Sequence, residues 1–255
     1  MTQFLPPLRT MLPAEHGSWF MLGFPLVLGL LLRPSLAGLC LGLAALAFFL
    51  SRPALRRVLN GQKDPAQWRA LGLLGGLAAS FGVATWVLSG PRFLVPLACI
   101  GPLVFLALRA DLDRAVRSLW VEMAAQGAFA GLLAAMLVAS GDSLPIAARA
   151  WWMVTLVGAA NLAHVRRFLG QAHGMVAAEL QRRRIPVHAL HLLLLSSSLW
   201  LLGTRNLTGS VWTGWTFLLY LRALLPYRPT PARTLGWREG GLSVVGLLLL
   251  WRALA

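Results

Sequence analysis

The chain has 255 residues, of which 58% are hydrophobic and 12% are charged, with 23 lysines and arginines against 8 acidic residues. A soluble domain carries about a quarter charged residues, so this composition excludes an ordinary soluble protein and indicates one that crosses a membrane several times. In a membrane protein, a net charge of +15 mainly reflects how the chain is oriented in the membrane, because cytoplasmic connections are rich in Lys and Arg. Nucleic acid is therefore not an expected partner.

Apolar segments follow one another along the whole chain, separated by Arg, Pro, Gly or Asp. A helix needs roughly 20 residues to cross a hydrocarbon layer of about 30 Å, and several segments are shorter than this. The sequence predicts an all-α, polytopic transmembrane helical bundle of eight or nine spans, with one short segment that could be re-entrant. Residues 1–255 are predicted to form a single transmembrane domain. The spans are expected at 17–32, 35–50, 70–89, 92–108, 118–139, 150–165, 187–203, 210–225 and 239–254.

Basic residues alternate between the connections. The N-terminus and the connections after spans two, four, six and eight hold 18 of the 23 basic residues, and the remaining connections hold five. Cytoplasmic connections are enriched in Lys and Arg, so we predict a cytoplasmic N-terminus and an external C-terminus. The first residues contain two prolines and no apolar run that ends in a cleavage site, so the first span is expected to target the protein.

Two further features bear on structure and on metal binding. Residues 165–186 mix apolar and charged side chains and end at Pro186, which favours a separate helix that stops before the seventh span. His188 and His191 have a spacing that can bind a metal or haem, but no carboxylate or thiolate accompanies them nearby. Cys40 and Cys99 lie in apolar runs and indicate neither a disulfide nor a zinc site. No metal and no cofactor is therefore assigned.

Polar side chains near the ends of spans one, five and six are the candidate functional residues. An ionisable group inside a membrane is costly and usually faces the bundle interior or a wet cavity. Arginine binds anionic oxygens through paired hydrogen bonds, so the group that ends span six suits a phosphate or an anionic headgroup. All candidates lie at the predicted cytoplasmic side, as a ligand-binding pocket, and no catalytic residue is assigned. They are Glu15, His16, Trp19, Arg57, Arg109, Asp111, Asp113, Arg114, Glu122, Asn161, His164, Arg166 and Arg167.

Each group also has a plainer interpretation. Glu15 and His16 fit an ordinary turn at the membrane surface, with the acid favoured by the start of a helix. Glu122 fits a buried acid that holds helices together, and Arg166 and Arg167 fit side chains that reach towards anionic lipid. The sequence leaves both interpretations open for each group.

The opening motif resembles a known family. Pro13-Ala14-Glu15-His16-Gly17-Ser18-Trp19, followed by Pro25 and Gly29, is similar to the Pro-x-x-His-Gly-x-Trp opening of the YwiC-like family of bacterial membrane proteins. The Arg-x-Asp-x-Asp-Arg sequence at 109–114 and the basic stretch after the sixth span are consistent with it. The resemblance implies a multi-pass protein of the bacterial inner membrane. It also implies, more loosely, an accessory role in respiration.

The topology is also similar to that of the UbiA prenyltransferase superfamily, which has nine helices and long cytoplasmic connections after the even-numbered spans. In that superfamily, Asp-rich motifs after spans two and six hold magnesium against a prenyl diphosphate. The corresponding connections here offer only Asn60 and Asp64 in the first and Glu179 in the second. A UbiA-like arrangement is therefore expected without ordinary magnesium-dependent prenyl transfer, because magnesium needs several oxygen ligands.

Three functions follow as hypotheses. The leading one is an accessory or ligand-binding subunit linked to respiration, without catalysis of its own. Its ligand would be a lipid, a quinone or a haem-like molecule, and its expected partners are membrane lipids, a respiratory-complex subunit or a hydrophobic small molecule. The alternative is a divergent, metal-independent UbiA-like prenyl or haem-modifying transferase. A small-molecule transporter is the third, although the outer halves of the spans are almost wholly apolar.

Overall fold

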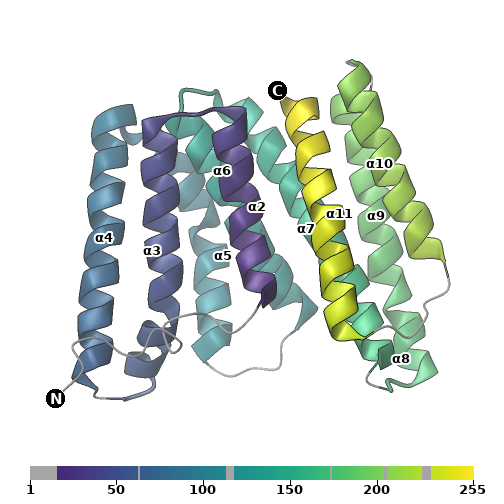
Figure 1. The fold of residues 1–255 in the computed structure, drawn as a ribbon, viewed down its shortest axis with the longest axis horizontal. Helices are drawn as coiled ribbons and strands as arrows, with labels where there is room; N and C mark the ends of the chain where they lie inside the picture. The colour runs from purple at the N-terminus through teal and green to yellow at the C-terminus, as the bar shows by residue number, and fades with distance from the viewer. Residues whose placement is uncertain (1–15, 63, 113–117, 173, 204–205, 226–230) are drawn as a thin grey trace. The chain divides into compact units, whose positions relative to one another are not determined.

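A computed structural model describes residues 16–62, 64–112, 118–172, 174–203, 206–225 and 231–255. These residues form helices with short connections, and no strand occurs among them. Nine helices in these ranges have at least 15 residues, which confirms the prediction of an all-α protein. The chain divides into two compact units, Met1–Ala148 (unit 1) and Arg149–Ala255 (unit 2), whose helices are labelled in Figure 1.

Unit 1 is built around its last long helix. In α6 almost every residue from Gln126 to Ala139 is buried, and α6 contacts α2, α3 and α5. The other close pair is α3 with α4, which lie side by side in Figure 1. The helices of unit 1 are α2 (His16–Leu32), α3 (Leu36–Leu59), α4 (Pro65–Ser89), the 3-10 turn η1 (Pro91–Phe93), α5 (Leu94–Leu112) and α6 (Leu119–Ala139).

Capping side chains mark where three helices of unit 1 begin. The Oγ of Ser35 accepts a hydrogen bond from the Gly38 amide, and Asp64 accepts one from the Ala66 amide. Ser118 does the same for Val121 at the start of α6. These caps satisfy amides that have no partner inside the first turn of a helix.

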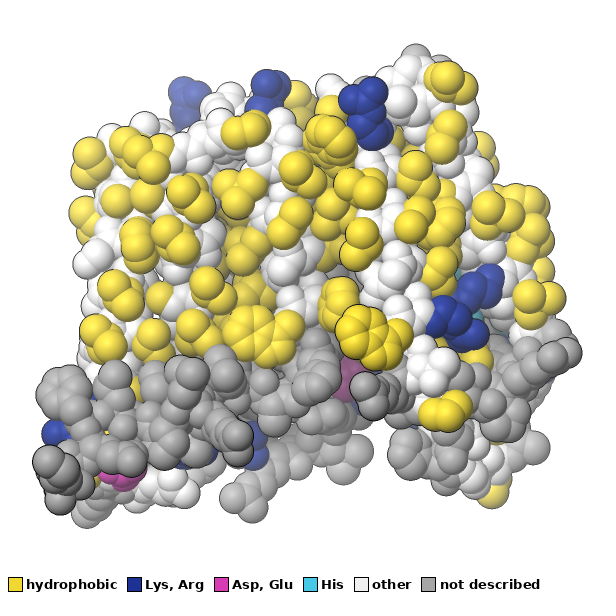
Figure 2. Space-filling model, viewed as in Figure 1, with side chains coloured by type: hydrophobic (Ala, Val, Ile, Leu, Met, Phe, Trp, Pro, Cys, Tyr) yellow, Lys and Arg dark blue, Asp and Glu magenta, His cyan; other side chains and the backbone are white. Residues whose placement is uncertain are grey.

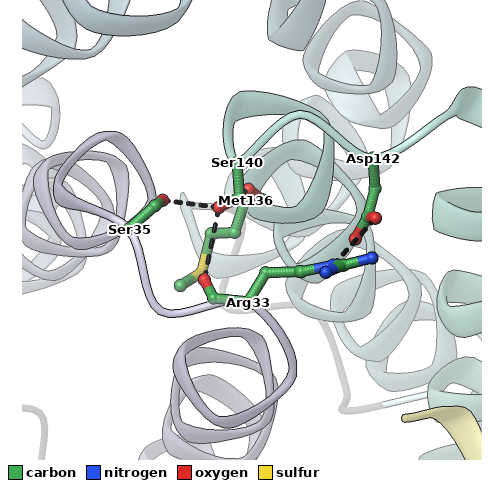
Figure 3. A network of polar contacts seen from close by, with 5 residues as sticks. All are labelled: Arg33, Ser35, Met136, Ser140 and Asp142. Carbon is green, nitrogen blue, oxygen red and sulfur yellow. Dashed lines mark hydrogen bonds and ion pairs between the residues drawn. The ribbon is translucent and has the colours of Figure 1, made fainter.

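A polar clasp ties the turn between α2 and α3 to the end of α6 (Figure 3). The Oγ atoms of Ser35 and Ser140 are 2.6 Å apart, and Ser140 Oγ is 2.8 Å from the Met136 carbonyl oxygen. Nε of Arg33 donates to Oδ1 of Asp142 at 3.0 Å. Helices α2 and α6 approach each other closely beside the clasp. A Cβ atom added to Gly29 of α2 would lie only 2.9 Å from Cε of Met136 in α6. A glycine at a helix contact lets two backbones approach closely, as is common where membrane helices pack.

The described residues of unit 2 form four long helices and two short elements. They are α7 (Leu144–Ala172), which begins in unit 1 and lies largely in unit 2, α8 (Ala177–Arg182), α9 (Arg184–Ser198), the π-helical turn η2 (Leu199–Gly203), α10 (Leu207–Leu224) and α11 (Ala232–Leu254). Helix α10 contacts α9, η2 and α11. Nε1 of Trp212, a fully buried side chain, donates to Ser198 Oγ at 3.0 Å, and Nε1 of Trp152 donates to Ser197 Oγ at 3.1 Å.

The predicted spans correspond to the nine long helices, but several helices continue beyond their apolar parts. Helix α3 runs on to Leu59, and α7 runs on to Ala172. The prediction of one separate helix over 165–186 is wrong, because α7 takes the first part and Gly174, with φ of 72°, makes a turn before α8. Pro186 lies inside the first turn of α9, where its missing N–H costs no helical hydrogen bond.

Six helical segments of the described residues are long and apolar enough to cross a membrane, and the chain is a multi-span membrane protein. They are Leu36–Leu59, Pro65–Ser89, Pro91–Ala110, Leu119–Ala139, Leu144–Gln171 and Ala178–Leu202. Trp19–Leu32 is a shorter apolar helix. Figure 2 shows hydrophobic side chains along the sides of the helices and basic side chains mostly at their ends. The crossings predicted at α2, α10 and α11 stay predictions.

Candidate functional site

A layer of polar side chains crosses unit 2, and each of its four long helices contributes one member. His164 comes from α7, His191 from α9, Arg222 from α10 and Glu239 from α11. His164, His191 and Glu239 are 3%, 5% and 7% exposed. All four lie within about two turns of the ends at which α7 and α10 finish and α9 and α11 begin. Buried polar groups of this kind, in helices that are otherwise apolar, mark a candidate functional site.

Arg222 joins two of the other helices. Its Nη2 lies 2.8 Å from Nε2 of His164 and also donates to Oε1 of Glu239. A guanidinium group has only donors, so Nε2 of His164 must be the acceptor of this hydrogen bond. The proton of a neutral imidazole then lies on Nδ1, and His164 carries no charge in this arrangement.

Glu239 is shared by two arginines. Its Oε1 meets Nη2 of Arg222 and also lies 3.5 Å from Nε of Arg238. The guanidinium carbon of Arg238 lies 5.2 Å from the centre of the Phe168 ring, a cation–π contact. The Glu239 side chain is 8% exposed, so its charge depends on these two cations for compensation.

The two histidines of α9 differ in their surroundings. Nδ1 of His191 lies 2.7 Å from the Val187 carbonyl oxygen and donates to it, and the ring centre is 6.0 Å from that of His164. The ring of His188 faces Tyr220 edge to face at 6.3 Å. Its Nδ1 is buried without a hydrogen-bond partner in the described part of the chain. Over that same part, no group of three or more His, Cys, Asp or Glu is arranged to hold a metal ion.

Four of the candidates from the sequence lie on α7, in unit 2. His164 belongs to the polar layer, and Arg167 is 7% exposed and has an interaction of its own. Asn161 and Arg166 are half-buried. The Arg166 carbonyl oxygen accepts a hydrogen bond from Nη1 of Arg183 at 3.2 Å, which ties the end of α7 to the start of α9.

The other described candidates lie in unit 1. Trp19 packs edge to face on Phe49 with ring centres 5.1 Å apart. Arg57 is half-buried near the end of α3, Arg109 is exposed near the end of α5, and Glu122 is half-buried in the first turn of α6. The backbone of His16 begins α2, and that of Asp111 lies in α5. Glu15, Asp113 and Arg114 lie outside the described residues.

Sequence reasoning missed Arg222, Arg238 and Glu239. The expected last span begins at Glu239, and the two arginines belong to the basic connection before it. A usable signal was present, because Glu239 is the sole acidic residue in 232–254 and lies two turns inside the helix that forms there. The rule that drew attention to Glu122, an acid within an apolar span, applies equally to Glu239.

The family relationship rests on the first half of the chain. A family model described as YwiC-like protein matches residues 12–139. Comparison with curated proteins and with solved structures gave no match. The matched residues lie in unit 1, so the polar layer of unit 2 is outside them. The chain belongs to the YwiC-like family.

Proposed function

We propose that the protein binds an anionic lipidic molecule at the polar layer of unit 2, as a membrane-embedded binding protein without turnover of its own. The observation that carries this proposal is the convergence of Arg222 and Arg238 on a single oxygen of Glu239. Two guanidinium groups and one carboxylate in direct contact leave one positive charge uncompensated among themselves. A ligand with a negatively charged headgroup would balance that charge.

The arginines also offer the hydrogen bonds that such a headgroup needs. A guanidinium group carries five N–H donors, and the contacts with Glu239 and His164 use only part of them. The side chains of Arg222 and Arg238 are 24% and 44% exposed, so a ligand can reach them. Paired donors on a planar cation suit the oxygens of a phosphate or carboxylate.

The position of the layer along α7 suits the headgroup of a lipid. Helix α7 has 29 residues and is therefore about 43 Å long, which exceeds the thickness of the hydrocarbon layer. Counting 20 residues from Leu144 covers about 30 Å and ends next to His164. A headgroup bound here would lie near the boundary of the hydrocarbon region, with its tail along the apolar sides of the helices.

Lipid binding by matched variants tests the proposal. The protein and its Arg222→Gln, Arg238→Gln and Arg252→Gln variants would be purified in mild detergent, and bound phosphatidylglycerol would be quantified by native mass spectrometry. Arg252 is exposed at the opposite end of α11 and serves as the control. We expect binding to fall roughly tenfold, or about 1.4 kcal/mol, in the first two variants only. Equal binding by all four proteins would contradict the proposal.

A divergent transferase is the second candidate, because the same pair of arginines can hold a diphosphate without a metal. Incubation of the purified protein with a prenyl diphosphate distinguishes the two functions. A binding protein leaves the prenyl diphosphate unchanged, whereas a transferase releases diphosphate in the presence of an acceptor.

The link to a respiratory complex and the UbiA-like arrangement stay predictions. Copurification from mildly solubilised membranes tests the first of these. A respiratory subunit that stays with the protein through two chromatographic steps would support an accessory role, and purification without one would count against it.

A further inference from the structure

We infer that Nε2 of His191 accepts a hydrogen bond from a hydroxyl group of the bound molecule, so that the ligand of the polar layer is an anionic lipid with a hydroxylated headgroup. A phosphodiester of glycerol or of another polyol belongs to this class. This assignment rests on the proposed function, and it names the headgroup chemistry of the same site.

The backbone of α9 determines which nitrogen of His191 carries the proton. A carbonyl oxygen only accepts, so Nδ1, which lies 2.7 Å from the Val187 carbonyl oxygen, must be the donor. A neutral imidazole has a single N–H, and Nε2 is then an acceptor. The neutral form suits this place, because the neighbouring ring of His164 is itself bound by the guanidinium group of Arg222. A second cation next to that group would be repelled.

This acceptor is buried and has no donor. His191 is 5% exposed, and no hydrogen bond to its Nε2 occurs among the described residues. A buried acceptor without a partner is unfavourable, because it has given up its hydrogen bonds with water. Two other acceptors of the layer, Nε2 of His164 and Oε1 of Glu239, already accept from Arg222. A donor on the ligand therefore gains most at Nε2 of His191.

The neighbouring arginines determine which kind of donor can approach. Arg222 and Arg238 share Glu239, and Arg167 is buried three positions after His164. An ammonium donor, such as that of phosphatidylethanolamine, would add one more cation among these guanidinium groups. A hydroxyl group donates without carrying a charge. The favoured headgroup therefore has its negative charge on the phosphate and its donor on a hydroxyl group.

One headgroup can reach both the arginines and the free acceptor. Nη2 of Arg222 lies 2.8 Å from Nε2 of His164, and the centres of the His164 and His191 rings are 6.0 Å apart. A single imidazole ring therefore separates the arginine donors from His191. A short polyol esterified to a phosphate carries its hydroxyl groups a few bonds from the phosphate oxygens. His191 is thus a specificity-determining residue that selects the headgroup, while Arg222 and Arg238 bind its phosphate.

Two lipids of equal charge test the role of His191. Phosphatidylglycerol and phosphatidylpropanol with the same acyl chains would compete for the purified protein, and native mass spectrometry would give the ratio of the two bound lipids. Only the glycerol headgroup has hydroxyl donors, and the comparison is independent of how many cations, Arg167 among them, surround the phosphate. The wild-type protein should prefer phosphatidylglycerol. His191→Phe should lower the ratio of phosphatidylglycerol to phosphatidylpropanol about tenfold, or about 1.4 kcal/mol.

His188→Phe is the matched control, one turn before His191 on the same helix. The His188 ring faces Tyr220, and its Nδ1 is enclosed, so this variant should keep the wild-type ratio. His191→Leu removes the same acceptor with a smaller side chain and should lower the ratio as His191→Phe does. It decides the matter, together with the wild-type ratio, if His191→Phe does not give a monodisperse protein.

The outcomes separate the role of His191 from the proposed function. A ratio that is unchanged in the His191 variants, or that falls equally in His188→Phe, overturns this role and leaves arginine-dependent binding intact. An unchanged ratio would mean that water satisfies Nε2 or that the hydroxyl group binds elsewhere, for example at Oε2 of Glu239. Failure to bind either lipid, or binding that does not depend on Arg222 and Arg238, overturns the proposed function itself.

Discussion

At the scale of single residues, the partners of Arg222 are far from it in the sequence. His164 lies 58 positions before it and Glu239 lies 17 positions after it. His164 is a candidate from the sequence because an ionisable side chain inside a membrane span is costly, and this reasoning needs only the local sequence. Pairing it with Arg222 requires knowing which faces of α7 and α10 look towards each other, and the hydropathy along either segment does not indicate this.

Loss of the acceptor at His164 should destabilise unit 2. His164→Phe fills a similar volume but leaves Nη2 of Arg222 without one of its two acceptors. We expect the free energy of unfolding to fall by about 1.5–3 kcal/mol, the usual contribution of a hydrogen bond to a charged group. Thermal unfolding in detergent measures the change.

His188→Phe is the control for this prediction. Its Nδ1 is buried and has no partner among the described residues, so the substitution removes no hydrogen bond at that atom. We expect a change within about 0.5 kcal/mol. A His164→Phe variant as stable as the wild-type protein would show that Arg222 does not depend on the imidazole.

At the scale of helices, the apolar segments predicted where each helix lies better than where it begins and ends. The span expected at 35–50 corresponds to α3, which continues to Leu59 because Ala, Leu and Arg are good helix formers whether or not they are buried. The helix ends at Asn60, and Gly61 follows with φ of 83°. The next helix begins after Asp64, whose side chain caps it, with Pro65 in the first turn. Turn and cap residues therefore fix boundaries that hydropathy leaves open.

At the start of α10, Gly209 has no room for a side chain. A Cβ on Gly209 would lie 2.0 Å from the carbonyl oxygen of Leu202 in the π-helical turn, and a backbone atom cannot yield as a side chain does. Gly209→Ala should therefore lower the stability by about 1–3 kcal/mol or more, because the turn and the helix must separate.

Gly214→Ala in the same helix is the matched control, since no atom lies within 4 Å of its added Cβ. It should leave the stability unchanged or raise it by up to about 1 kcal/mol through helix propensity. Thermal midpoints of both variants in the same detergent give the comparison. Equal midpoints would show that η2 and α10 are not packed as closely as described.

At the scale of the whole molecule, the nine long helices of the described residues and the alternating basic connections lead us to propose opposite locations for the two ends of the chain. Alkaline phosphatase fused after Ala255 should be active, because the enzyme folds only outside the cytoplasm. A fusion at Gln62, in the basic connection between α3 and α4, should be inactive. Activity at Gln62, or inactivity at Ala255, would mean a reversed orientation or an even number of crossings.

The sequence predicts a feature of this protein well when all the residues that define the feature lie in one continuous segment. The apolar segments predicted the long helices, and the motif from Pro13 to Trp19 indicated the family, because both are continuous in the sequence. The polar layer joins four helices that are separated by up to 75 positions, from His164 to Glu239. Its charge balance depends on packing, and no single segment contains it.

The clasp at the turn after α2 has a mechanical consequence for unit 1. Ser35 and Ser140 join the loop that follows Leu32 to the end of α6, whereas Trp19 lies at the opposite end of α2. The Leu32 end of α2 is therefore restrained by hydrogen bonds to α6, and the Trp19 end by aromatic packing on Phe49 of α3, so the two ends of one helix are held by different neighbours.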